Sequence, residues 1–157
     1  MKTEKEPIPS EFEEQKALIT WWREIGCIEY HLPQHLLFAI PNGGSRHPGE
    51  ARRLKESGVL AGVPDLFFAV GFMDHHGLFI EMKKRKGGHI SKPQWDMIYY
   101  LGKAGFKDQV CYGFEDAKKA IGAYLNELGY EGWPGGNGAF EIGTNNYLGE
   151  KITNELD

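Results

Sequence analysis

The sequence predicts an α/β protein in which helices flank a mixed β-sheet. Four short apolar runs have the length of strands, and the stretches between them carry apolar residues at helical spacing. Gly, Pro and Asn separate most of these segments, as they commonly do at turns. The resulting order is helix, strand, helix, strand, strand, helix, strand, helix, which is typical of a layered fold with a mixed sheet.

The first helix is predicted to begin after Ser10 and to end at Gly26. Ser10 and Glu13 have the spacing of a capping box, in which each side chain accepts a hydrogen bond from the other residue's backbone. Glu11 and Gln15 lie four residues apart, at the edge of the apolar face. That face is expected to contain Phe12, Leu18, Ile19, Trp22 and Ile25.

The middle of the chain contains two strands that are apolar enough to be covered on both faces of a sheet. An Asp-His-His-Gly stretch joins them and is typical of a hairpin turn. The expected segments are a strand over 35–40, a Pro-Asn-Gly-Gly turn over 41–44, a basic helix over 49–57, strands over 65–70 and 78–84, and the hairpin turn over 74–77.

The last folded part is predicted to be helix, strand, helix. Ser91 opens a helix that carries Pro93 in its first turn and runs to about Ala104. A strand over 109–114 and an amphipathic helix over 115–128 follow. We therefore expect one domain over 10–129, after an N-terminal extension of residues 1–9. Residues 130–157 show little apolar periodicity, and we expect a tail that is partly disordered or docks onto the body or a partner.

Length and composition are those of one ordinary globular domain. No run of about 18 apolar residues predicts a membrane span, and the acidic start lacks the apolar region of a signal peptide. Cys27 and Cys111 form no Cys-x-x-Cys pair, so a disulfide framework is not expected. An intracellular, reducing compartment is the expectation, and secretion is not.

The net charge of -4 is unevenly distributed. Residues 1–14 carry a net charge of -3 and residues 130–157 carry -4, which leaves +3 on residues 15–129. Residues 15–129 are therefore mildly basic, so the negative net charge of the whole chain does not argue against binding to nucleic acid.

The most informative segment is Gly62-Val63-Pro64-Asp65, followed fifteen residues later by Glu81-Met82-Lys83. Alternate residues of a strand share a face, so Glu81 and Lys83 point the same way. A hairpin would bring Asp65 beside Glu81. Two carboxylates and an ammonium would then lie together among strongly apolar neighbours, where charges are costly to desolvate.

A divalent cation between the two carboxylates would relieve their repulsion. Carboxylate oxygens with few other ligands suit Mg²⁺ or Mn²⁺, which can polarise a phosphoryl oxygen and activate water. Lys83 would hold the attacking water and offset negative charge. This is the outline of a phosphodiester hydrolysis site. The alternative is a structural salt bridge of Lys83 with Glu81 or Asp65, which is the usual explanation of an isolated Glu-x-Lys.

These residues resemble the PD-(D/E)XK nuclease signature, and the ordered set of motifs resembles the virus-type replication-repair nuclease (VRR-NUC) domain over about residues 10–125. The matching motifs are Glu11 and Gln15, the turn of 41–44 with Arg46, the segment from Glu50 to Gly58, Gly62 to Asp65, Glu81 to Lys83, and finally Ser91, Gln94, Leu101 and Gly105.

The resemblance implies a restriction-endonuclease-like fold and dependence on Mg²⁺ or Mn²⁺. It implies that Asp65 and Glu81 are metal ligands, together with the Met82 carbonyl, and that Lys83 is the catalytic lysine. It also implies that Glu11 completes the acidic site. Glu14 is the rival for that role, and both acids have an ordinary alternative as solvated first-turn residues.

The resemblance further places Gln94 beside the active site, as a catalytic residue. Ser91 and Gln94 also have the spacing of a capping box, so a purely structural role stays open. Gln15 is a secondary candidate.

Phosphate contacts are expected from two basic clusters, because such contacts fix a protein on nucleic acid. The alternative for any single lysine is solubility. The candidates are Asn42, Arg46, Arg52 and Arg53 before Asp65, and Lys84, Arg85, Lys86 and Lys92 after Lys83.

Aromatic residues at helical spacing are expected in the core or in a dimer interface. They are Trp21, Trp22, Trp95, Tyr99 and Tyr100. His75 and His76 are expected in a turn and not in a zinc site, since no further ligands lie at suitable spacing. Both cysteines are expected in the core.

The leading hypothesis is a metal-dependent DNA endonuclease in the cytoplasm of a bacterial or phage-infected cell. The resemblance implies a homodimer that cuts branched DNA such as four-way (Holliday) junctions, as in DNA repair. The alternatives are a catalytically silent DNA-binding module of the same fold and a sequence-specific restriction-type endonuclease.

Overall fold

The structure is a computed structural model, and it describes residues 7–41, 48–71 and 74–130. Three predictions lie outside these residues: the tail beyond Tyr130, the turn of 41–44 beyond its first residue, and the phosphate contacts Asn42 and Arg46. The helical elements are α1 (Glu11–Trp21), η1 (Trp22–Gly26), α2 (Cys27–Glu29), η2 (Gln34–Leu36), α3 (Pro48–Glu56), α4 (Lys92–Lys103) and α5 (Phe114–Glu127). The strands are β1 (Leu37–Ala39), β2 (Leu66–Phe68), β3 (Leu78–Lys83) and β4 (Lys107–Tyr112).

The strands form a mixed sheet in the order β1-β2-β3-β4, which confirms the predicted α/β class. β1 pairs antiparallel with β2, and β2 with β3, whereas β3 and β4 are parallel. The antiparallel pairing of β2 and β3 confirms the predicted hairpin. The parallel pair requires a crossover, and α4 supplies it.

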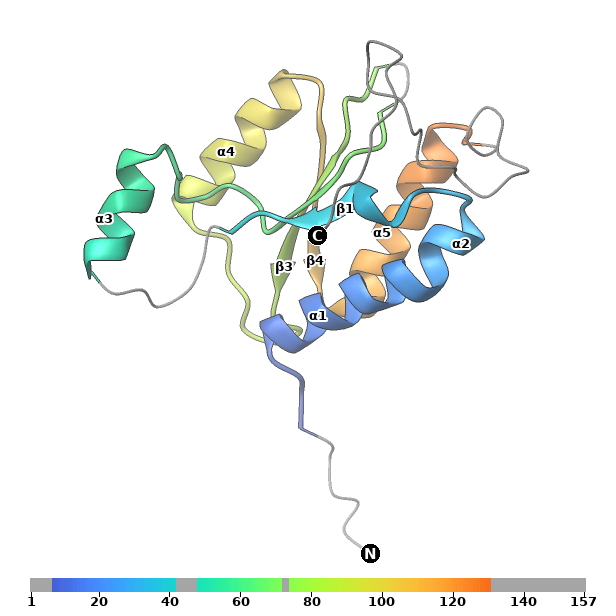
Figure 1. Cartoon of the computed structure of the whole chain (residues 1–157), viewed down its shortest axis with the longest axis horizontal. Coiled ribbons are helices and arrows are strands. Elements are labelled where there is room, and N and C mark those ends of the chain that lie inside the picture. The colour runs from blue at the N-terminus through green and yellow to red at the C-terminus, as the bar shows by residue number, and fades with distance from the viewer. Residues whose placement is uncertain (1–6, 42–47, 72–73, 131–157) are drawn as a thin grey trace, which may run out of the picture.

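Helices cover the sheet, and α3 stands apart from it (Figure 1). One face carries Leu66, Ile80 and Met82, which are fully buried with Leu18 of α1 and Ile121 of α5. The other face begins with a run of aromatic contacts. Phe67 lies 4.5 Å from Phe79 and 5.9 Å from Phe106, measured between ring centroids. The alternation of side chains along each strand separates these two layers.

The first helix does not end at Gly26, contrary to the prediction. It continues through the π-helical turn η1 into α2, with Gly26 in ordinary helical geometry. A Cβ at Gly26 would lie 2.8–2.9 Å from the rings of Trp21 and Trp22. The glycine is therefore there to make room for two tryptophans, not to terminate the helix.

The predicted apolar face of this helix was also partly wrong. Phe12 and Ile25 are 74% and 55% exposed, whereas Glu14 and Trp21 are buried. The series Glu14, Leu18 and Trp21 is itself at helical spacing. The buried side of the helix therefore includes a carboxylate, and the π-helical turn changes the register beyond Trp21.

All four strands differ in their bounds from the predictions, and β2 and β3 are shorter than expected. The strand expected over 35–40 begins with the short 3₁₀ helix η2, which leaves only Leu37–Ala39 in the sheet. The last strand starts two residues early, because the Lys107 N–H donates to the Gly77 carbonyl (2.9 Å) and extends the pairing with β3. Phe114 belongs to α5 and packs against the core. Among the described residues, no helix has the length and apolar character needed to cross a bilayer.

Replacing Gly26 by Ala should destabilise the fold although Ala is the better helix former. The new methyl group would overlap both tryptophan rings, and overpacking of this kind costs roughly 1–3 kcal/mol. Gly102 of α4 is the matched control, because its Cβ would meet only a carboxylate oxygen at 3.8 Å. Gly102→Ala should gain up to about 1 kcal/mol. Urea unfolding of both variants checks this, and equal effects would contradict it.

Candidate active site

The pairing of β2 with β3 brings Asp65 to Glu81. Leu66 is paired with Ile80 in an antiparallel register, so Asp65 lies one step further along, opposite Glu81. Asp65 Oδ2 accepts a hydrogen bond from the Met82 N–H at 2.8 Å, which fixes this carboxylate beside β3. The sequence prediction that the two carboxylates come together agrees with this arrangement.

Glu81 is the centre of the cluster and is only 2% exposed. Its Oε1 accepts hydrogen bonds from the Lys83 ammonium and from the Gln94 amide. Its Oε2 is buried and has no hydrogen-bond partner in the described part of the chain. Lys83 is also buried, at 7% exposure. An ion pair this deep is unlike an exposed salt bridge, whose contribution is small.

Gln94 makes the capping contacts and also contacts the acidic cluster. Its side-chain oxygen accepts from the Ser91 N–H (2.8 Å) and from the Ser91 hydroxyl (3.0 Å), as in a capping box. Its amide nitrogen donates to Glu81. The cap that starts α4 therefore also orients a side chain of the acidic cluster.

Gly62 explains how the loop before Asp65 approaches α4. Its φ is +93°, and a Cβ there would lie 2.5 Å from the Pro93 carbonyl oxygen and 3.0 Å from the Gln94 nitrogen. A residue with a side chain would push the first turn of α4 away. The Gly-Val-Pro-Asp segment thus sets the position of Gln94 as well as that of Asp65.

Burial raises the pKa of Glu81 to about 7. The hydrogen bond from Lys83 acts in the opposite direction, whereas the charges of Asp65 and Glu11 raise the pKa further. Burial also raises the pKa of Asp65, against the lowering effect of the Met82 N–H and the Lys83 charge. Both carboxylates are therefore held in an environment that disfavours their negative charge.

The two acids at the start of α1 have different surroundings. Glu11 is half-buried, and its charge acts on Asp65 and Glu81. Glu14 is buried and faces elsewhere. It accepts from the Phe114 N–H at 2.7 Å and forms an ion pair with Arg85. Of the two rivals, only Glu11 acts on the acidic cluster in this structure. Gln15 is half-buried on the same helix.

The site fits a divalent cation of the Mg²⁺ type. Among the described residues, no group of three or more His, Cys, Asp or Glu side chains is arranged to hold a metal. Mg²⁺ commonly uses one or two carboxylates and keeps several waters. Asp65 and the unpartnered Oε2 of Glu81 provide such a pair, and a cation would relieve the burial of their charge.

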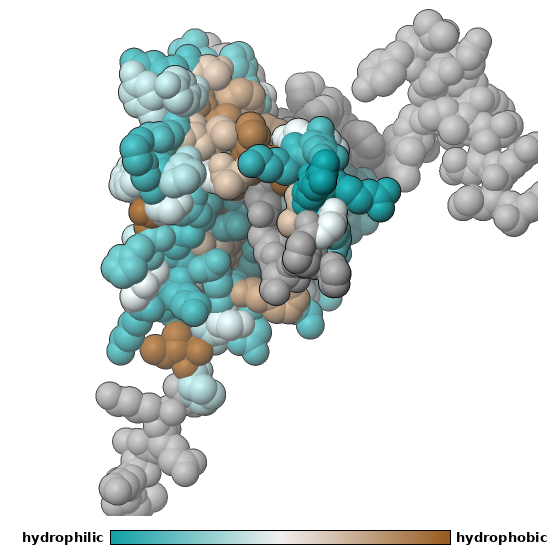
Figure 2. All heavy atoms as spheres, turned by 90° about the vertical axis from the view of Figure 1, so that its left-hand side faces the viewer, coloured by the Kyte–Doolittle hydropathy of each residue, from teal (hydrophilic) through white to brown (hydrophobic). Residues whose placement is uncertain are grey.

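The candidate phosphate contacts are in different situations. Lys84 and Lys86 are exposed just beyond β3. Arg85 is held by Glu14, Lys92 pairs with Asp96 (2.7 Å), and Arg52 pairs with Glu56 (2.7 Å). The face that carries α3 and α4 is largely hydrophilic, with apolar side chains gathered in its upper part (Figure 2). This surface is compatible with a polar partner.

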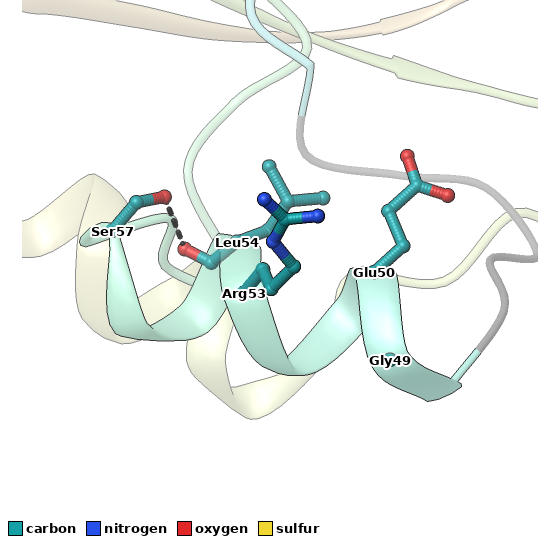
Figure 3. A pocket seen from close by; sticks show the side chains of 5 residues that line it. All are labelled: Gly49, Glu50, Arg53, Leu54 and Ser57. Carbon is teal, nitrogen blue, oxygen red and sulfur yellow. Dashed lines mark hydrogen bonds between the residues drawn. The ribbon is translucent and has the colours of Figure 1, made fainter.

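Arg53 lines a hollow of about 550 Å³ beside α3, with Gly49, Glu50, Leu54 and Ser57 (Figure 3). Glu50, Arg53 and Leu54 point to the same side of the helix, and the Ser57 hydroxyl donates to the Leu54 carbonyl at 2.8 Å. The hollow is lined by α3 and contains none of Asp65, Glu81 or Lys83, so it is separate from the acidic cluster.

The remaining predictions concern aromatic, histidine and cysteine residues. Trp21, Trp22 and Cys111 are in the core, as expected, and Cys27 is half-buried against it. Trp95, Tyr99 and Tyr100 are 56%, 59% and 68% exposed, so a core role is wrong for these three. His75 lies 3.6 Å from Glu127 on the surface.

Sequence reasoning missed the contact between Glu14 and Arg85. The sequence predicts Glu14 as a rival of Glu11 or as a solvated first-turn acid, and Arg85 as a phosphate contact. The signal that was available is the helical spacing of Glu14 with Leu18 and Trp21, which places the carboxylate on the buried side.

Comparison with known proteins supports the fold. A solved structure described as a VRR_NUC domain protein is similar to this chain with a TM-score of 0.61 and 25% sequence identity. The similarity covers 76% of this chain and 91% of that chain. No family model and no curated protein matches the chain. The fold is therefore VRR-NUC-like.

The elevated pKa of Glu81 predicts a specific pH dependence of stability. Between about pH 4.5 and about pH 7 the folded state binds more protons than the unfolded state. The free energy of unfolding should therefore fall as pH rises through this window. One pKa unit corresponds to about 1.4 kcal/mol, so the fall due to Glu81 is on the order of 3 kcal/mol. Asp65 adds to it in the same direction.

Urea unfolding in a chelator at both ends of this window, for wild type and Glu81→Gln, measures the effect. The Gln variant cannot titrate at this position and should show a distinctly smaller fall. The histidines contribute equally to the pH dependence of both proteins, so their contribution cancels in the comparison. An equal fall in both proteins would contradict the assignment.

Proposed function

We propose that the protein is a divalent-metal-dependent nuclease that hydrolyses phosphodiester bonds in DNA. The observation that carries the proposal is the buried cluster of Asp65, Glu81 and Lys83, in which Glu81 Oε2 has no partner among the described residues. The VRR-NUC-like fold supports the same reaction class.

Each residue of the cluster would have a definite role. Asp65 and Glu81 would hold Mg²⁺ or Mn²⁺, with the Met82 carbonyl as a further ligand. When bound, the cation would polarise the phosphoryl oxygen and lower the pKa of a bound water. Lys83 would orient the attacking water and offset the negative charge that develops on the phosphate. Gln94 would keep Glu81 in position through its amide.

A catalytically silent DNA-binding module is the second candidate. Burying Glu81 and Lys83 opposes folding, because desolvation of such ions is expensive. A function for these two residues would explain why the chain keeps them buried. Phosphate binding alone needs exposed cations and gains nothing from two carboxylates. The composition of the cluster therefore favours an enzyme over a binding module. It does not distinguish a structure-specific nuclease from a restriction-type enzyme.

We further propose that the protein acts as a homodimer on branched DNA such as four-way junctions. The exposed aromatic face of α4, made of Trp95, Tyr99 and Tyr100, supports an interface between two copies. A twofold axis would give two equivalent sites, which suits paired symmetric cuts.

Lys83→Ala should abolish cleavage while DNA binding is retained. Removing a group that stabilises charge in the transition state costs roughly 10²–10³-fold in kcat. The assay uses labelled linear duplex, flap, fork and four-way junction DNA with Mg²⁺, Mn²⁺ or a chelator. Lys119→Ala, an exposed lysine of α5, is the matched control and should cleave normally. Cleavage by Lys83→Ala at the wild-type rate would refute the assignment.

The same proteins test the cation without measuring activity. Mg²⁺ or Mn²⁺ should raise the melting temperature of the wild type, because a ligand that binds only the folded state stabilises it. Asp65→Ala should lose this increase. A wild type that is indifferent to both cations, and that cuts DNA in a chelator, would exclude metal dependence.

The double variant Tyr99→Glu, Tyr100→Glu should be monomeric in sedimentation velocity, whereas the wild type sediments as a dimer. Two buried like charges on each side would repel across the interface. Ile28→Glu changes an exposed apolar residue outside α4 and should remain dimeric. On a four-way junction the monomeric variant should leave single nicks in place of paired cuts. A monomeric wild type would contradict the dimer.

A further inference from the structure

A buried carboxylate joins three segments that are distant in the sequence. Glu14 of α1 is 2% exposed. It accepts a hydrogen bond from the Phe114 N–H at 2.7 Å, at the start of α5. It also accepts one from Arg85 Nη2 at 3.1 Å and lies 2.5 Å from Arg85 Nε. Two nitrogens of the guanidinium therefore lie close to one carboxylate, and Nη2 donates the hydrogen bond.

Gly113 is the residue that permits this arrangement. Its φ is +96°, and a Cβ at this position would lie 2.8 Å from Arg85 Nε and 3.3 Å from the Glu14 carboxyl carbon. Gly113 is also the N-cap of α5 and has no side chain with which to cap the helix. The Glu14 carboxylate takes that role from a different helix and meets the positive end of α5.

The same contact restrains the segment that follows Lys83. Arg85 comes two residues after Lys83, in the loop that leaves β3. This loop folds back, because a Cβ at Gly88 would lie 2.9 Å from Lys83 Cβ. The loop is thus held at Arg85 by Glu14 and packs at Gly88 against Lys83, which is buried and bonded to Glu81.

We propose that Arg85 is a positioning residue, which through Glu14 holds the 84–88 loop over Lys83, and that it is not a phosphate contact. The proposal rests on the proposed function, because it assigns a role in the reaction to the site of Lys83. Release of Arg85 to a phosphate would leave Glu14 buried with the Phe114 N–H as its remaining described partner. The Arg85 side chain is 47% exposed, and Lys84 and Lys86 of the same loop are exposed as well. What distinguishes Arg85 is its contact with the buried Glu14.

The two roles differ in their salt dependence. A cation that contacts phosphate releases counterions, so its loss lowers the slope of log K against log salt by about 1. We expect Arg85→Met to keep the wild-type slope of DNA binding, measured in a chelator with fluorescent duplex. We expect Lys86→Met to show the reduced slope.

Kinetics supply the second readout. Misplacing a reacting group can cost up to about 10²-fold in rate, so Arg85→Met should lower kcat roughly tenfold or more with little change in KM. Gly113→Ala disturbs the same contact without removing a charge and should show the same split. Arg85→Lys keeps the charge but replaces the planar guanidinium, which reaches Glu14 through two nitrogens, by a single ammonium. It should therefore also lower kcat. Lys119→Met is the control with normal activity.

The outcomes separate the two proposals. A wild type that does not cleave DNA overturns both of them. If the wild type cleaves DNA and Arg85→Met or Arg85→Lys keeps the full kcat, only the positioning role is overturned. The positioning role is also overturned if Arg85→Met reduces the salt slope of DNA binding as much as Lys86→Met does. If Arg85→Met does not fold, Arg85→Lys decides the question, because a phosphate contact would tolerate the lysine.

Discussion

Burial of Glu81 is the constraint on which the rest of the site depends. A carboxylate that is nearly inaccessible to water must find partners within the chain. Lys83 and Gln94 donate hydrogen bonds to one of its oxygens, and the other oxygen has no partner among the described residues. The sheet, the cap of α4 and the Gly62 loop each place one neighbour of this carboxylate. Their geometry is best understood as a means of tolerating one costly charge.

Two tight backbone approaches turn this constraint into structure. Gly62 lets the loop before Asp65 contact the first turn of α4, and Gly113 lets Arg85 and Glu14 meet above the start of α5. In both cases a positive φ and the absence of a Cβ are needed together. Each approach brings a loop against the N-terminus of a helix, where backbone N–H groups lack partners within the helix.

The fold class and the central cluster could be predicted from the sequence because both depend on local patterns. The alternation of Glu81 with Met82 and Lys83 needs only the geometry of a strand, and the turn residues between β2 and β3 define a hairpin. The end of α1 could not be predicted, because Gly26 follows tertiary packing on Trp21 and Trp22. Glu14 was misjudged because its partners lie about 70 and 100 residues away along the chain.

Stability and proposed function are coupled through the same carboxylates. Raised pKa values mean that ionisation of the cluster destabilises the protein near neutral pH. The proposed function would require the same carboxylates to be ionised, because a cation binds the charged form. A bound cation would remove this penalty, and under the proposed function the groups that weaken the fold without a cation are its ligands. Arg85 and Glu14 stabilise the region without neutralising Glu81. The ion pair of Arg85 with Glu14, which stabilises the structure, is therefore separate from Glu81, the carboxylate to which we assign a role in the reaction.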